Sequence, residues 1–271
     1  MLATRVITAV LLLAACIAAM FLLPNGWWAA ALLVVILGAA WEWSTLAGYG
    51  RVGRWVFCGM IFFPAIAIYL AADAGCVIAP NVELEFVVYA AGCAFWAIVA
   101  PVWLARRWQV GAPLWTAVTG CLVLIPAWLA IARLQLDPVQ LLQLLGIVWL
   151  ADTAAYLAGR SWGKRKLAPQ ISPGKTWEGV AGAVAAVAVY YVVLSNFTSA
   201  RSWASGWGGV LVFAGVASMS IIGDLFESWM KRRAGVKDSG ALLPGHGGIL
   251  DRIDGLTASM PLAALLTRYL G

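Results

Sequence analysis

Two pairs of acidic residues near the end of the chain have the i, i+3 spacing of neighbours on a helix. Asp224 and Glu227 form the first pair, and Asp251 and Asp254 form the second. Residues three apart share one helical face, so each pair can direct two carboxylates to the same side. Converging carboxylates repel one another unless a cation binds between them. The spacing therefore predicts a site for a divalent metal ion.

The stretch between these acids is rich in basic residues and glycine. The whole chain has 18 basic and 12 acidic residues, and positions 223–254 hold five of each. Gly247 and Gly248 follow the single histidine, His246, and such a segment can turn its N–H groups toward an anion. These are the components that hold Mg²⁺ and polyphosphate. The alternative is internal neutralisation by salt bridges that pair Glu227 with Lys231 and Asp251 with Arg252.

Two further polar positions adjoin apolar sequence earlier in the chain. Asp152 lies in an apolar run, where a carboxylate is either functional or satisfied by a buried hydrogen bond. Lys175 precedes another run, where it could contact phosphate at a helix N-terminus or only set the topology, with Thr176 as the N-cap. A P-loop is excluded, because Pro169 stands where the motif requires glycine and we expect no strand before it.

The elements that must position these residues are membrane helices. Hydrophobic residues make up 63% of the chain, and the mean hydropathy is +0.89. Long apolar runs match the thickness of a bilayer, and they lack the alternation of a β-barrel. We therefore expect an all-α polytopic membrane bundle of about nine transmembrane helices, at 5–23, 27–46, 55–72, 84–104, 111–132, 139–159, 176–196, 207–227 and 252–270.

Basic residues set the expected orientation. With the N-terminus in the cytoplasm, 15 of the 18 basic residues fall on the cytoplasmic side, and the reverse topology inverts the ratio. The acid pairs then face the cytoplasm. The net charge of +6 is explained by topology, so nucleic acid is not an expected partner. We expect residues 1–135 to form a scaffold and residues 136–271 a catalytic region.

Several other classes of function are excluded or disfavoured. One histidine and five cysteines without CxxC spacing give too few ligands for a zinc site, and no GxSxG motif indicates a serine hydrolase. A transporter would place charges at the bilayer midplane and carry internal repeats. Here the charges gather at one face, and we find no internal repeat.

The charged stretch resembles the signature of the phosphatidate cytidylyltransferases, also called CDP-diacylglycerol synthases. The matching positions are 228–232, 237–240 and 243–254, and the segments 152–156, 172–173, 175–179 and 223–224 are similar to that family as well. Gly174 departs from the family pattern, in which many members carry lysine. The resemblance implies that CTP and phosphatidate give CDP-diacylglycerol and pyrophosphate. It also implies Mg²⁺ with Asp224 and Asp251 as ligands, and a monovalent cation such as K⁺ at a second site.

The resemblance and the residue chemistry together assign roles. A phosphatidate oxygen attacks the α-phosphorus of CTP in line, so positioning and charge neutralisation dominate. A CTP-dependent lipid kinase needs the same components and stays open on residue chemistry alone. The expected partners are both substrates and the bilayer of a bacterial-type inner membrane, and a homodimer is compatible with the sequence. The expected catalytic residues are Asp224, Asp251, Lys237, His246 and Arg252; substrate binding is assigned to Lys231, Arg232, Lys175, Ser228, Asp152, Glu178, Gly247 and Gly248; metal binding is assigned to Asp224, Asp251, Asp254 and Glu227.

Overall fold

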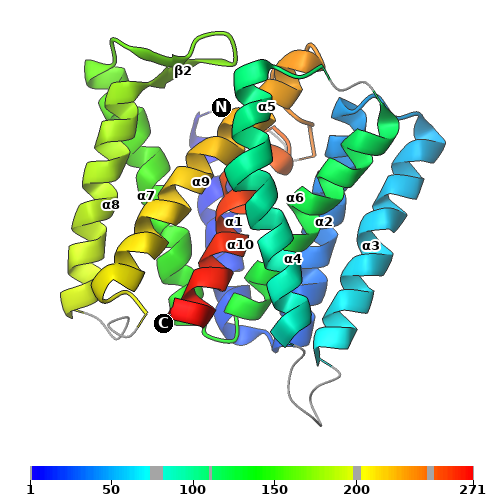
Figure 1. The fold of residues 1–271 in the computed structure, drawn as a ribbon, viewed down its shortest axis with the longest axis horizontal. Coiled ribbons are helices and arrows are strands. Elements are labelled where there is room, and N and C mark those ends of the chain that lie inside the picture. Colours follow the sequence, from blue (N-terminus) through cyan, green and yellow to red (C-terminus); the bar gives the residue numbers. More distant parts are fainter. Residues whose placement is uncertain (1, 74–81, 110–111, 198–202, 243–246, 271) are drawn as a thin grey trace.

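A computed structural model describes residues 2–73, 82–109, 112–197, 203–242 and 247–270. These residues form a bundle of long helices with a small β-hairpin at one end (Figure 1). The helices are α1 (Leu2–Leu22), α2 (Asn25–Leu46), α3 (Arg51–Asp73), α4 (Val82–Ala94), the π-helical segment η2 (Phe95–Val99), α5 (Ala100–Arg106), α6 (Pro113–Leu134), α7 (Pro138–Trp162), α8 (Trp177–Phe197), α9 (Gly206–Arg233) and α10 (Leu250–Leu270).

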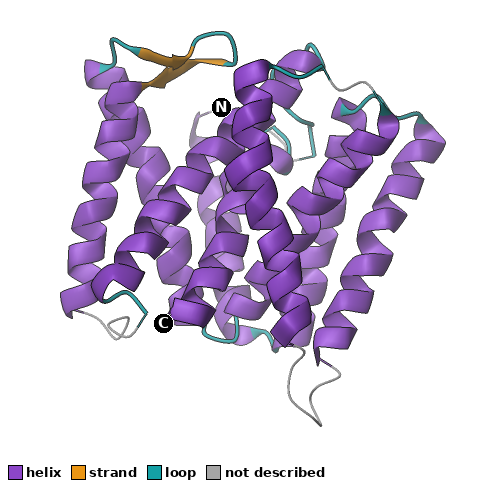
Figure 2. Ribbon diagram, in the orientation of Figure 1, coloured by secondary structure: helices purple, strands orange, loops and turns teal. Residues whose placement is uncertain are grey.

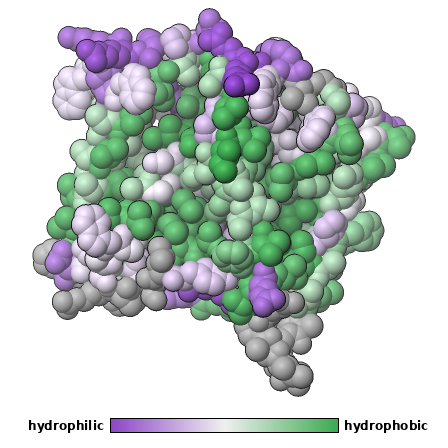
Figure 3. Space-filling model, viewed as in Figure 1, coloured by the Kyte–Doolittle hydropathy of each residue, from purple (hydrophilic) through white to green (hydrophobic). Residues whose placement is uncertain are grey.

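Apolar composition explains why most of these helices form as they do. By length and composition, seven helices within the described ranges are able to cross a membrane: α2, α3, the continuous helix from α4 to α5, α6, α7, α8 and α9. Each of them coincides with a predicted apolar run. Apolar side chains cover most of the face in view, and hydrophilic ones gather along its upper edge (Figure 3). The chain is therefore a largely helical, polytopic membrane protein.

One prediction about secondary structure is wrong. We expected no strand before Ser172, but β1 (Lys166–Ala168) pairs antiparallel with β2 (Ser172–Thr176) above α7 and α8 (Figure 2). The turn between them closes through a hydrogen bond from Ile171 N to Ala168 O. Pro169 occupies the second position of this turn, which its fixed φ favours. The same proline still excludes a P-loop, because the motif needs glycine there.

The core joins the two halves of the sequence around Phe226 of α9. Its ring lies 5.5 Å from each of Phe95, Trp96 and Trp103, and 6.4 Å from Trp43. These aromatic residues come from α2 and from the helix that runs from α4 to α5. Edge-to-face aromatic pairs add to the stabilisation that burial provides. Because Phe226 precedes Glu227, this packing fixes α9 beside the charged stretch.

Candidate active site

Most of the predicted site residues line one cavity at the end of the bundle that carries the hairpin, whereas Glu178, Glu227, Gly247 and Gly248 do not. The cavity has a volume of about 640 Å³ and is lined by α7, the hairpin, the start of α8, α9, α10 and the segment between these last two helices. The second acid pair, Asp251 and Asp254, lines the cavity in full, but only Asp224 of the first pair does. Its charged lining consists of Asp152, Asp224, Asp238, Asp251 and Asp254, and of Arg160, Lys175, Lys231, Arg232, Lys237 and Arg252.

Close packing between α9 and α10 brings the acids together. A Cβ added to Gly223 would lie 2.5 Å from the carbonyl oxygen of Asp254, and one added to Gly255 would lie 2.6 Å from Ser220 Oγ. Both distances are shorter than van der Waals contact, so each helix carries glycine where the other approaches it. These glycines neighbour Asp224 and Asp254 in the sequence. The crossing therefore sets the separation of the acidic side chains.

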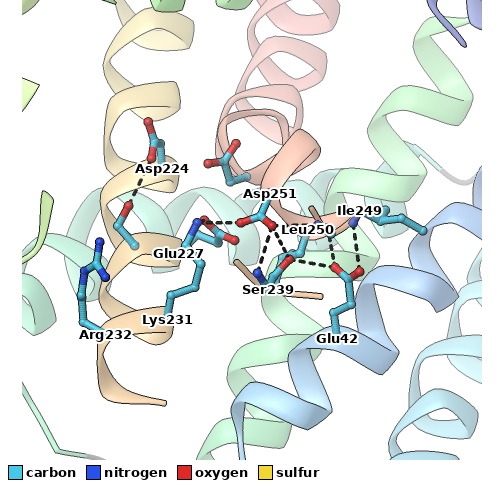
Figure 4. Close-up of polar contacts among 12 residues, drawn as sticks. Glu42, Asp224, Glu227, Lys231, Arg232, Ser239, Ile249, Leu250 and Asp251 are labelled. Carbon is cyan, nitrogen blue, oxygen red and sulfur yellow. Dashed lines mark hydrogen bonds and ion pairs between the residues drawn. The ribbon is translucent and has the colours of Figure 1, made fainter. Parts of the chain in front are cut away.

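Lys231 joins the two acidic helix ends. Its Nζ lies 2.5 Å from Glu227 Oε2 on the same helix and 2.6 Å from Asp251 Oδ1 on α10 (Figure 4). All three side chains are largely buried, so each carboxylate depends on the ammonium for compensation. The Glu227–Lys231 salt bridge was one of the sequence alternatives. Here it coexists with an interhelical ion pair that the spacing alone does not predict.

A second ion pair connects the hairpin to α9. Lys175 Nζ lies 2.5 Å from Asp224 Oδ2, and Ser228 Oγ lies 3.4 Å from Asp224 Oδ1. Lys175 therefore has an electrostatic partner in addition to any role in topology. Thr176 is the N-cap of α8, as predicted, since its hydroxyl accepts a hydrogen bond from Gly179 N at 3.1 Å.

Asp152 has the hydrogen-bond partner of one sequence interpretation, and its place in the cavity is compatible with the other. It lines the cavity, and its Oδ1 lies 3.4 Å from Ser220 Oγ on α9. Glu178 does not line the cavity. Its carboxylate accepts hydrogen bonds from Lys164 N and Arg165 N at 3.1 Å, which fastens the start of α8 to the turn that follows α7. Glu178 thus stabilises the base of the hairpin and does not belong to the cavity.

The segment before α10 holds the Asp251 carboxylate in position by backbone hydrogen bonds. Asp251 Oδ2 accepts hydrogen bonds from Ser239 N and Gly248 N, both at 2.9 Å. Gly247 has φ = +82°, a left-handed conformation that favours glycine. The N–H of Gly248 is therefore directed at Asp251, where the sequence suggested a phosphate. His246 lies outside the described residues.

Comparison with known proteins shows the family of this chain. The model of the cytidylyltransferase family matches residues 3–270. The chain belongs to the cytidylyltransferase family. A phosphatidate cytidylyltransferase of Pseudomonas aeruginosa is 38% identical over 273 residues, which cover 98% of this chain and 97% of the relative. One of Haemophilus influenzae is 36% identical over 82% of this chain and 83% of the relative.

The carboxylates of the cytidylyltransferase site suit the way in which proteins usually bind Mg²⁺. Within the described ranges, no three Asp, Glu, His or Cys side chains are grouped closely enough to enclose a metal ion. Mg²⁺ is seldom held by such a cage: it uses one or two carboxylates, with water and substrate phosphate as the other ligands. Asp224 and Asp251 line one cavity, so the donor set fits this mode of binding. The sequence predicted four carboxylate ligands, whereas this mode of binding needs only one or two.

Sequence reasoning assigned no role to Arg160 and Asp238, which line the cavity of this cytidylyltransferase site, or to Glu42, which lies beside it. Glu42 comes from α2, in the segment predicted as scaffold, yet it hydrogen-bonds to Ser239 and to the start of α10. Glu42 is an acid in the apolar run 27–46, which was an available signal. Nothing in the sequence indicates its partners, which follow about 200 positions later.

Proposed function

We propose that this chain transfers the cytidylyl group of CTP to phosphatidate, giving CDP-diacylglycerol and pyrophosphate. The observation that carries the proposal is the cavity, where carboxylates and cations meet beside helices able to cross a membrane. A water-soluble nucleotide and a lipid phosphate can reach such a site from the aqueous phase and from the bilayer. The named activity of relatives that align over most of the chain supports the same reaction.

The reaction needs little covalent help from the protein. A phosphate oxygen of phosphatidate attacks the α-phosphorus of CTP, a new P–O bond forms, and the bond to the β-phosphate oxygen breaks to release pyrophosphate. The protein must hold two polyanions in line and offset their charge. We assign this role to Lys237, Arg232 and Arg252, which line the cavity, with His246 as a further candidate.

Mg²⁺ is the cofactor that the donor set fits, with Asp224 and Asp251 as its protein ligands. When bound, it neutralises phosphate charge and lowers the cost of bringing the two substrates together. We propose that Asp254 and Asp152, which line the same cavity, orient these ligands. A monovalent cation such as K⁺ at a second site, and a homodimeric assembly, are further parts of the proposal.

The proposed function also requires a particular orientation of the helices in the membrane. We propose nine transmembrane spans, with α1 and α10 added to the seven apolar helices, and a cytoplasmic N-terminus. This arrangement places the cavity at the cytoplasmic face of a bacterial inner membrane, where CTP is available. It follows the positive-inside rule, because the hairpin and the end of α9 carry many of the basic residues.

A labelling experiment tests the proposed reaction. Purified protein is incubated in detergent micelles with phosphatidate and CTP labelled in the cytosine ring, and the lipid is extracted. We expect the label in the lipid and one pyrophosphate released per labelled lipid. Transfer of the γ-phosphate, with no cytidine in the lipid, would instead identify a CTP-dependent lipid kinase.

A further inference from the structure

Glu42 lies beneath the segment that carries the candidate active site. Its side chain is buried, with an exposed fraction of 2%. Glu42 Oε1 accepts a hydrogen bond from Ile249 N at 3.0 Å, and Oε2 accepts one from Leu250 N at 2.9 Å (Figure 4). Leu250 is the first residue of α10 and Ile249 directly precedes it, so both N–H groups lie at the helix N-terminus, which favours negative charge. The carboxylate of α2 therefore caps the helix that carries Asp251.

Ser239 extends this contact to Asp251. Its hydroxyl oxygen lies 2.9 Å from Glu42 Oε2 and 3.0 Å from Asp251 Oδ2. The two carboxylates therefore share one hydroxyl group, and Ser239 N also donates to Asp251 at 2.9 Å. The position of Glu42 consequently affects the position of a carboxylate that lines the cavity.

Two glycines leave room for the Glu42 carboxylate. A Cβ added to Gly240 would lie 2.3 Å from Glu42 Oε1, and its three nearest atoms would all belong to Glu42. A Cβ added to Gly248 would lie 2.1 Å from Ser239 Oγ and 2.4 Å from Glu42 Oε2. The segment before α10 is thus fitted closely around this one side chain.

We propose that Glu42 is a positioning residue, which holds Ser239 and the start of α10 so that Asp251 is directed into the cavity. The proposal on turnover rests on the proposed function, and the proposal on local structure stands without it. It makes α2 part of the site, although no residue of α2 lines the cavity. The effect on catalysis is transmitted through hydrogen bonds to Asp251.

The first test compares Glu42→Gln with Glu85→Gln. In either orientation of the amide that Glu42→Gln introduces, its NH₂ group would face the backbone N–H of Ile249 or of Leu250. Glu85 is the matched control, because it is equally buried but pairs with Arg133 and Arg268 at the other end of α10. We expect kcat of Glu42→Gln to fall about 10- to 100-fold, as for other residues that orient a metal ligand, with the KM for phosphatidate changed less than about threefold.

The control separates positioning from a general loss of stability. We expect Glu85→Gln to lower the Tm at least as much as Glu42→Gln, with kcat per folded protein close to that of the wild type. Equal losses of kcat in both variants, in proportion to unfolding, would overturn the proposal. So would a kcat of Glu42→Gln within about twofold of the wild type.

A second measurement does not depend on activity. Hydrogen exchange of peptides that cover 237–252 should be faster in Glu42→Gln than in the wild type, and unchanged in Glu85→Gln. If the wild type transfers no cytidylyl group, the proposed function fails, but this exchange measurement still decides the structural claim. Unchanged exchange in Glu42→Gln would overturn it.

A double-mutant cycle identifies the contact. Gly240→Ala should impair turnover by displacing Glu42, and it should have little further effect when combined with Glu42→Ala, because the clashing atoms are gone. Additive losses in the double variant would contradict the proposed contact.

Discussion

Lys231 Nζ lies 2.6 Å from Asp251 Oδ1, and this ion pair is a direct polar link between the end of α9 and the start of α10. The same ammonium also pairs with Glu227. One buried cation therefore balances two buried carboxylates, so its loss affects both helices. This arrangement links the stability of the protein to the geometry of the site.

Replacing Lys231 tests that link. Lys231→Met leaves Glu227 and Asp251 without their cation, and breaking a buried pair of this kind costs about 3–5 kcal/mol. We expect a clear fall in Tm in detergent and a loss of cytidylyl transfer. Arg233→Met is the control, because it removes the same charge two positions later from a residue that does not line the cavity. Equal Tm values for the two variants would show that the pair contributes little.

The helix crossing at Gly223 gives a second prediction. Gly223→Ala would place a methyl group 2.5 Å from the carbonyl oxygen of Asp254, so α9 and α10 must separate. Overpacking of this kind costs about 1–3 kcal/mol, and we expect activity to fall with stability. The control is Gly26→Ala in α2, where an added Cβ meets no atom within 4 Å. A Gly223→Ala variant as stable as Gly26→Ala would contradict the close approach.

Thiol labelling tests the proposed orientation. In a variant without native cysteines, Gln170→Cys in the hairpin turn should react with a membrane-impermeant maleimide only after the cells are permeabilised. Leu136→Cys, which is 68% exposed in the connection between α6 and α7, should react in intact cells that have a permeable outer membrane. The opposite pattern would place the cavity on the other side of the membrane.

Much of this fold follows from local sequence. The apolar runs predicted the helices because a membrane span needs only length and apolar composition. The i, i+3 acid pairs predicted a shared site, and Asp224, Asp251 and Asp254 line one cavity, although α9 continues to Arg233, past the expected end at 227. The cap at Thr176 was likewise readable from residue type and position.

Other parts of the site depend on contacts between distant residues. Glu42 and Ser239 are 197 positions apart, and no local pattern indicates that they meet. The Glu178 carboxylate bonds to backbone N–H groups that exist in the right place only once the turn after α7 has formed. The hairpin strands are short and lack a clear alternation of apolar residues, so their pairing becomes visible only in the structure.

The central claim is that Asp224 and Asp251 act together at one site for cytidylyl transfer. Pyrophosphate release from CTP and phosphatidate should be measured for the wild type, Asp224→Asn and Asp251→Asn across a Mg²⁺ titration. We predict that each variant loses at least about 10³-fold in rate, since both carboxylates are proposed metal ligands, and that saturating Mg²⁺ does not restore it. Wild-type rates in either variant at saturating Mg²⁺ would contradict the account.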